Sequence, residues 1–129
     1  CVIDDEASAV LRRFPGMDAI VLATPVYFFG PSAQLKLILD RFYSLCKFDR
    51  VKGSVETALK GKIVAVIASS GGPNLDTGLA MIRQTFQTVA GFSGARCEAL
   101  LVPGAGLSGA LAGNKDAREK AIAFGAMLA

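Results

Sequence analysis

The stretch DAIVLATPVYFFG, Asp18–Gly30, contains the transition that decides the fold. Its first part, Asp18–Thr24, is continuously apolar rather than alternating, which is typical of a parallel strand buried on both faces. A proline follows, and Val26–Phe29 then places four large apolar residues where the strand should become a loop. Loops lie at the surface, so large apolar side chains in a loop need a reason.

The composition predicts one globular domain over residues 1–129. Of these residues, 52% are hydrophobic and 19% are charged, which is enough for a single core. The apolar runs are far shorter than the roughly 20 residues of a membrane-spanning helix. No segment has the layout of a signal peptide, so we predict no contact with a membrane.

The net charge is +3, with a mild basic cluster between residues 47 and 62. The cluster consists of Lys47, Arg50, Lys52, Lys60 and Lys62. Such a run is usually a solvated loop, and the alternative is that it steers an anionic substrate. There is no continuous basic stripe, so nucleic-acid binding is not predicted.

The cysteines and the absence of histidine exclude several classes of site. Cys1, Cys46 and Cys97 are odd in number and widely spaced, so no disulfide framework or zinc site follows. We expect a reduced, cytoplasmic setting, with Cys46 and Cys97 as small core hydrophobes. A chain without histidine has no His-based acid–base catalysis and no Ser-His-Asp chemistry.

Helix and strand patterns alternate along the chain as α-β-α-β-α-β-α. The predicted strands are Asp18–Thr24, Lys62–Ser70 and Arg96–Gly104. The predicted helix caps are, in chain order, Asp4 or Asp5, Ser32, Asn74 or Asp76, and Asn114 or Asp116. The third helix is expected to end at Gly91, and a helical turn is expected near Val55–Leu59. This order predicts an α/β fold with a parallel sheet and helices on both faces.

Three strands make a thin sheet, and one edge of Asp18–Thr24 would be unpaired. The sequence also begins at Cys1 rather than at a methionine. We therefore expect the N-terminal part of the domain to precede Cys1. With a further strand and βα unit there, the sheet would have the five strands of a flavodoxin-like, three-layer domain.

Two loops stand out as a ligand site, because open parallel sheets bind ligands beyond the carboxyl ends of their strands. Thr24–Gly30 combines the rigid Pro25, rings for stacking, and Gly30, which permits unusual dihedrals or a close backbone approach. Ser69–Gly72 offers hydroxyls and accessible amides. We expect one cleft for a flat aromatic ligand. The alternative is that the rings fill the core and the glycines only turn the chain.

Three stretches resemble the NADPH-dependent FMN reductase and iron–sulfur flavoprotein group of the flavodoxin-like superfamily. TPVYFFGPSAQLKLILDR, Thr24–Arg41, is similar to the group's Ser/Thr-Pro-x-Tyr loop and the helix that follows it. LKGKIVAVIASSGG, Leu59–Gly72, resembles its next strand and Gly-rich end. CVIDDE, Cys1–Glu6, resembles the segment after a Cys-rich stretch in many members.

The resemblance implies FMN as the cofactor, NAD(P)H as the electron donor, and a quinone, free flavin or similar small molecule as the acceptor. The implied flavin contacts are Thr24, Pro25, Val26, Tyr27, Phe28, Phe29, Gly30, Ser69, Ser70, Gly71 and Gly72. No catalytic side chain is expected, because the flavin carries the chemistry. The resemblance also implies a homodimer or homotetramer, with the helix Ser32–Cys46 and the following loop near the interface.

The resemblance also places important parts outside this sequence. The family's phosphate-binding loop and the cysteines of its iron–sulfur members would precede Cys1. Because a cluster takes four ligands, we expect none in this chain. Two other functions remain open. One is an electron carrier that docks on a protein partner, which the basic pI disfavours, and the other is a flavin-free module. Arg41 and Asp40 are either interface residues or, for Asp40, half of a helix pair with Lys36.

Overall fold

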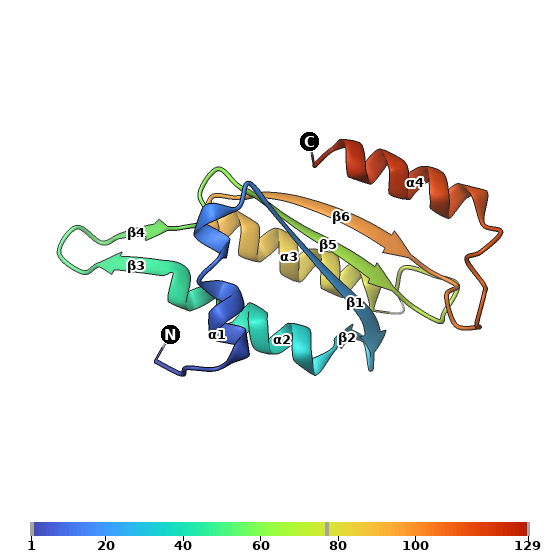
Figure 1. The fold of residues 1–129 in the computed structure, drawn as a ribbon, viewed down its shortest axis with the longest axis horizontal. Helices are drawn as coiled ribbons and strands as arrows, with labels where there is room; N and C mark the ends of the chain where they lie inside the picture. The colour runs from blue at the N-terminus through green and yellow to red at the C-terminus, as the bar shows by residue number, and fades with distance from the viewer. Residues whose placement is uncertain (1, 77, 129) are drawn as a thin grey trace.

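The computed structural model describes residues 2–76 and 78–128 and shows a sheet with helices on both faces (Figure 1). The helices are α1 (Glu6–Leu11), α2 (Ala33–Asp40), α3 (Leu79–Ser93) and α4 (Lys115–Ala126), with 3₁₀ turns η1 (Phe14–Gly16) and η2 (Arg41–Leu45). The strands are β1 (Ala19–Tyr27), β2 (Gly30–Pro31), β3 (Cys46–Asp49), β4 (Ser54–Thr57), β5 (Ile63–Ser69) and β6 (Arg96–Val102). The predicted α/β class is confirmed.

The central sheet has the strand order β2-β1-β5-β6. β1, β5 and β6 are the three predicted strands, and they run parallel, with Pro25 opposite Ser69 and Ser69 opposite Val102. This register brings the carboxyl ends of all three strands to one edge. β2 was not predicted; it pairs two residues antiparallel to the end of β1.

The helices are divided unequally between the two faces of the sheet (Figure 1). α1, α2 and α3 cover one face, where Leu79, Ile82 and Phe86 pack in the main core against β5. In the described part of the chain α4 alone covers the other face, where Phe124 packs against Leu100 in a much smaller core. No helix among the described residues is long and apolar enough to cross a membrane.

Within the described residues β1 is buried on one face only, which differs from the two-sided burial that its sequence predicts. Ile20 and its neighbours on the helix-covered face are in the main core. On the opposite face Val21 is 43% exposed, and Ala23 and Pro25 are exposed as well. The reason is the position of α4, whose Phe124 packs over β5 and β6 and not over β1.

α3 differs from its prediction at both ends. Neither Asn74 nor Asp76 caps it, because the helix begins after Gly78, whose φ of 103° is left-handed and which provides no side-chain cap. The helix continues past Gly91 because its buried stripe runs on for another turn. It ends at Gly94, which has a φ of 66°.

The helical turn predicted near Val55–Leu59 is also wrong. β3 and β4 pair as an antiparallel hairpin that projects from the body of the molecule (Figure 1). The Asp49 Oδ1 atom accepts hydrogen bonds from the amides of Val51 and Lys52 at 2.9 and 3.0 Å, and Gly53 (φ 64°) completes the reversal. The β-branched residues after this turn favour a strand over a helix.

The other predicted helix starts are confirmed. The side chains of Asp5, Ser32 and Asn114 each accept a hydrogen bond from a backbone amide in the first turn of α1, α2 and α4. Val10 on α1 and Ala121 on α4 are exposed.

A charged contact ties α1 to the end of α2. The Arg41 Nη1 atom donates to both carboxylate oxygens of Asp5, at 2.6 and 2.8 Å, and the Arg41 side chain is only 16% exposed. Hydrogen bonds from Arg41 and from the Ser8 amide hold the pKa of Asp5 below its usual value. Arg41 thus has a partner within its own chain, and Asp40 forms the predicted pair with Lys36.

The contact between Arg41 and Asp5 predicts a pH-dependent stability. Because folding lowers the pKa of Asp5, the pair stabilises the fold above the unfolded-state pKa of about 3.9 and loses this effect as the pH falls through the folded-state pKa. We expect Arg41→Gln to lower the urea midpoint clearly at pH 7 and much less at about pH 2.5. The control Lys36→Gln breaks an exposed pair and should change little at either pH. An equal loss from Arg41→Gln at both pH values would contradict this account.

Candidate functional site

The aromatic loop is a two-residue hairpin between β1 and β2. Tyr27 pairs with Gly30, and the two residues between them have positive φ angles, 47° for Phe28 and 68° for Phe29. Positive φ at both central positions defines a type I′ turn, which normally contains Asn-Gly. A side chain with a Cβ is disfavoured in this conformation, and a bulky one is an outlier. The turn is therefore strained.

The rings of this turn point into solvent. Tyr27 is 66% exposed, Phe28 97% and Phe29 55%, and the two phenylalanine rings meet edge to face at 5.7 Å between centroids. The alternative that they fill the core is therefore wrong. Strained backbone and exposed rings both oppose folding, so their combination points to a ligand or partner that needs them.

Gly30 does not have the role that its sequence position suggests. Its φ is not positive, and a Cβ placed on it would meet only the Tyr27 carbonyl oxygen, at 4.0 Å. The two phenylalanines carry the unusual dihedrals instead. The glycine that allows a close approach at this turn is Gly78 at the start of α3, which the sequence reasoning missed.

The remaining residues of the first loop face opposite sides of the sheet, as successive strand residues must. Thr24 is buried at 4% exposure. Its hydroxyl donates to the Pro25 carbonyl at 2.8 Å and accepts from the Ser32 amide at 3.0 Å. Thr24 thus joins the end of β1 to the start of α2, whereas Pro25 faces the open side beside Ser69.

The second loop, Ser69–Gly72, lies beside the first, but several of its polar groups already form hydrogen bonds within the protein. The Ser70 amide donates to the Val102 carbonyl at 3.0 Å, and the Ser70 hydroxyl donates to the Gly72 carbonyl at 3.2 Å. Of the hydroxyls and amides expected to be accessible in Ser69–Gly72, those of Ser70 are therefore already hydrogen-bonded within the protein. Ser69 is half-buried, and Gly71 is exposed beyond it.

A third loop, after β6, braces the second one, and the sequence reasoning missed it. The amides of Gly104 and Ala105 donate to the carbonyls of Gly72 and Ser70, both at 2.8 Å. A Cβ on Gly106 would lie 3.0 Å from the Gly71 Cα atom, so the two backbones touch. The sequence feature that could have indicated this loop is a Gly-rich segment directly after the carboxyl end of the third parallel strand, where ligand-site loops lie.

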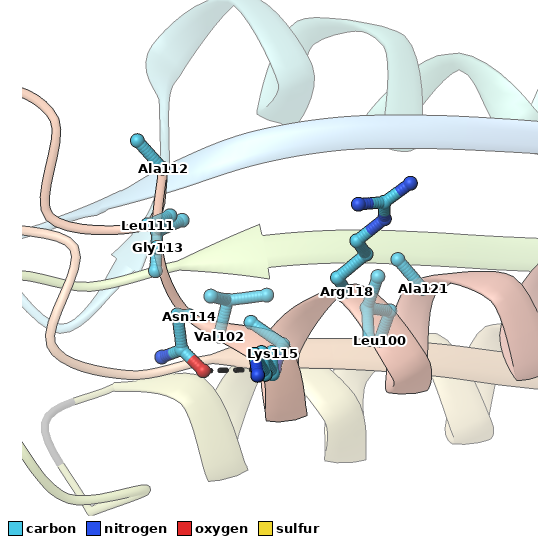
Figure 2. Close-up of a pocket in the computed structure, with 10 residues that line it drawn as sticks. Leu100, Val102, Leu111, Ala112, Gly113, Asn114, Lys115, Arg118 and Ala121 are labelled. Carbon is cyan, nitrogen blue, oxygen red and sulfur yellow. Dashed lines mark hydrogen bonds between the residues drawn. The ribbon is translucent and has the colours of Figure 1, made fainter.

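A hollow of about 490 Å³ lies elsewhere, between α4 and the second face of the sheet (Figure 2). Leu100, Val102 and Arg118 line it, together with the first turn of α4. None of the residues predicted to contact flavin lines this hollow. The register places Val102 in one row with Ser69 and Pro25, so the hollow and the exposed side of β1 belong to the same face.

Cys46 and Cys97, the two cysteines within the described residues, offer no reactive thiolate and no metal site. Burial raises the pKa of Cys46, and burial together with the neighbouring Glu98 raises the pKa of Cys97. Both thiols therefore stay protonated at neutral pH, and Cys97 packs against the main core as predicted. Cys1 lies outside the described residues. Within residues 2–76 and 78–128, no three Cys, Asp or Glu side chains gather in a possible metal site.

The family model for NADPH-dependent FMN reductase matches residues 1–104. The chain belongs to this family. An iron–sulfur flavoprotein of Methanocaldococcus jannaschii is 39% identical over 72 residues, which are 56% of this chain and 35% of that protein. An FMN-dependent NADH:quinone oxidoreductase of Methylocella silvestris is 32% identical over 123 residues, covering 91% of this chain and 57% of that protein.

Solved structures confirm the flavodoxin-like fold. An FMN-dependent NADH-azoreductase from Bacillus anthracis, solved in complex with FMN, has a TM-score of 0.67 and 17% identity, covering 95% of this chain and 62% of that one. The matched part of this chain thus spans between 35% and 57% of the length of the two curated relatives named above.

The strain in the turn predicts that Phe28 and Phe29 make the fold less stable than residues suited to a type I′ turn would. Asn-Gly suits a type I′ turn, and Phe28 has almost no buried surface to lose. We expect the double change Phe28→Asn and Phe29→Gly to raise the free energy of unfolding by about 1 kcal/mol, as measured by urea denaturation. A loss of similar size would mean that the rings stabilise the fold, which contradicts the account of strain.

Proposed function

We propose that this chain holds the isoalloxazine ring of FMN against Thr24–Gly30 and Ser69–Gly72. The carrying observation is the strained turn that exposes Phe28 and Phe29 at the carboxyl edge of the sheet. The residues present fit such a ring, because exposed aromatic faces stack on flat ligands. Membership of an FMN reductase family supports flavin over other aromatic ligands.

We further propose that the protein is an NAD(P)H oxidoreductase that reduces a quinone, free flavin or similar small molecule. FMN, when bound, supplies the acceptance and release of electrons. The chain's own residues bind and orient it: Pro25 stiffens the loop, and the rings exclude water. Neither loop contains Asp, Glu, Lys or Arg, so no carboxylate or amine in these loops moves a proton.

A complete domain is proposed to cover the open side of β1. Val21, Ala23 and Pro25 are exposed there, and in the described part of the chain the outer edge of β1 pairs only with β2. A further strand and βα unit would extend the sheet from that edge and cover the hollow along α4, as expected for a single domain with five parallel strands. A phosphate site for FMN is proposed to belong to the same addition.

A homodimer or homotetramer is proposed, with the helix Ser32–Cys46 and the following loop near the interface. Tyr43 and Phe48 support this proposal, because their rings stack at 4.9 Å and both are exposed. The free thiols of Cys46 and Cys97 support a reducing compartment such as the cytoplasm.

Steady-state turnover separates the enzyme from the electron carrier. We expect the protein with added FMN to oxidise NADH or NADPH continuously when benzoquinone is present. Phe28→Ala should lower kcat/KM by about 3- to 10-fold through lost stacking. The control Ile122→Ala removes an exposed apolar side chain on α4, outside the two loops, and should change nothing. Bound flavin without turnover would favour a carrier that docks on a protein, and an unchanged Phe28→Ala would contradict the ring wall.

A further inference from the structure

Gly78 lies directly beneath the aromatic turn. A Cβ on this residue would lie 2.6 Å from the Val26 Cγ1 atom, and 2.8 and 2.9 Å from the Phe29 Cα and carbonyl carbon atoms. Distances below 3 Å are not tolerated between such atoms, so the turn and the start of α3 can approach this closely only at a glycine. The contact includes main-chain atoms of Phe29, which cannot move aside as a side chain does.

α3 cannot yield at this contact because it is fixed in the core. Leu79, the next residue, is 0% exposed, and Ile82 and Phe86 continue the buried stripe. The carbonyl of Gly78 also accepts the first hydrogen bond of the helix, from the Ile82 amide at 3.0 Å. The start of α3 is thus a rigid support, and any added atom at position 78 displaces the turn instead.

We infer that Gly78 is a positioning residue for the flavin site: it sets the place of the Phe28–Phe29 turn and hence of the ring wall. This inference rests on the proposed function. The three atoms nearest to a Cβ on Gly78 belong to Val26 and Phe29, so its effect falls on recognition of the isoalloxazine ring. A change at Gly78 therefore weakens FMN and riboflavin by the same factor.

The chain offers a matched control for the strain that any side chain brings at positive φ. Gly61 has a φ of 77°, similar to that of Gly78 in sign, but a Cβ on it would meet no atom within 4 Å. It precedes β5, at the opposite end of the strand from the two loops. Gly61→Ala thus imposes backbone strain without touching the turn. Gly78→Ala imposes backbone strain and also presses against the turn.

Two measurements on wild type, Gly78→Ala and Gly61→Ala test the inference. NMR chemical shifts of Phe28 and Phe29 report the turn without ligand, and quenching of flavin fluorescence reports binding of FMN and riboflavin. We expect Gly78→Ala to move both phenylalanine signals and to weaken both flavins at least about tenfold, which is a loss of 1.4 kcal/mol. Gly61→Ala should leave the signals and both affinities unchanged.

Each outcome decides between the inference and the proposed function. Unmoved phenylalanine signals in folded Gly78→Ala overturn the positioning role, as does weakening of FMN alone. If the signals move but wild type quenches neither flavin, the support of the turn stands and the proposed flavin site fails. If Gly78→Ala does not fold, Val26→Ile is the substitute variant, because it adds a methylene group to the side chain that faces Gly78 in the same contact. It should then move the Phe29 signals, and unmoved signals would overturn the inference.

Discussion

The parallel register of β1, β5 and β6 is the constraint on which the candidate site depends. It aligns Pro25, Ser69 and Val102 in one row, so three loops that are far apart in sequence begin side by side. Backbone hydrogen bonds then join the second loop to the third, through the carbonyls of Ser70 and Gly72. The site is therefore a property of strand pairing first and of side-chain chemistry second.

The strain in the aromatic turn is sustained by the structure around it. Thr24, which precedes the turn in β1, donates a hydrogen bond from its hydroxyl and accepts another there. Gly78 supports the turn from the buried start of α3. These contacts fix where the chain enters and leaves the turn. The backbone of Phe28 and Phe29 therefore cannot leave the positive-φ region without breaking them. Such over-determined strain is typical of ligand sites, where a fixed geometry matters more than local stability.

Local pattern was sufficient for most of the fold. Apolar runs gave the three parallel strands, and the side chains of Ser32 and Asn114 marked two helix starts, because these features depend on a few neighbouring residues. The two Gly-flanked loops at strand ends were also recognisable, since the location of ligand sites in parallel sheets is general.

Properties that depend on distant contacts were missed. The positive φ angles fell on Phe28 and Phe29 rather than on Gly30 because β2 pairs with β1 in one particular register. Gly78 fell inside the predicted third helix, and its importance comes from the approach of α3 to β1, which no local pattern encodes. The one-sided burial of β1 follows from the position of α4, which no local pattern of Asp18–Thr24 encodes.

Mapping of FMN on the amide resonances of the isotopically labelled protein tests the central claim most directly. The account predicts that the largest shift changes fall at residues 27–30 and 69–72, with smaller ones at 104–106 in the bracing loop. Changes centred on residues 111–121, which line the hollow along α4, would place the ligand elsewhere. Together with unmoved resonances at Tyr27–Gly30, that result would contradict the assignment of the aromatic turn as the flavin wall.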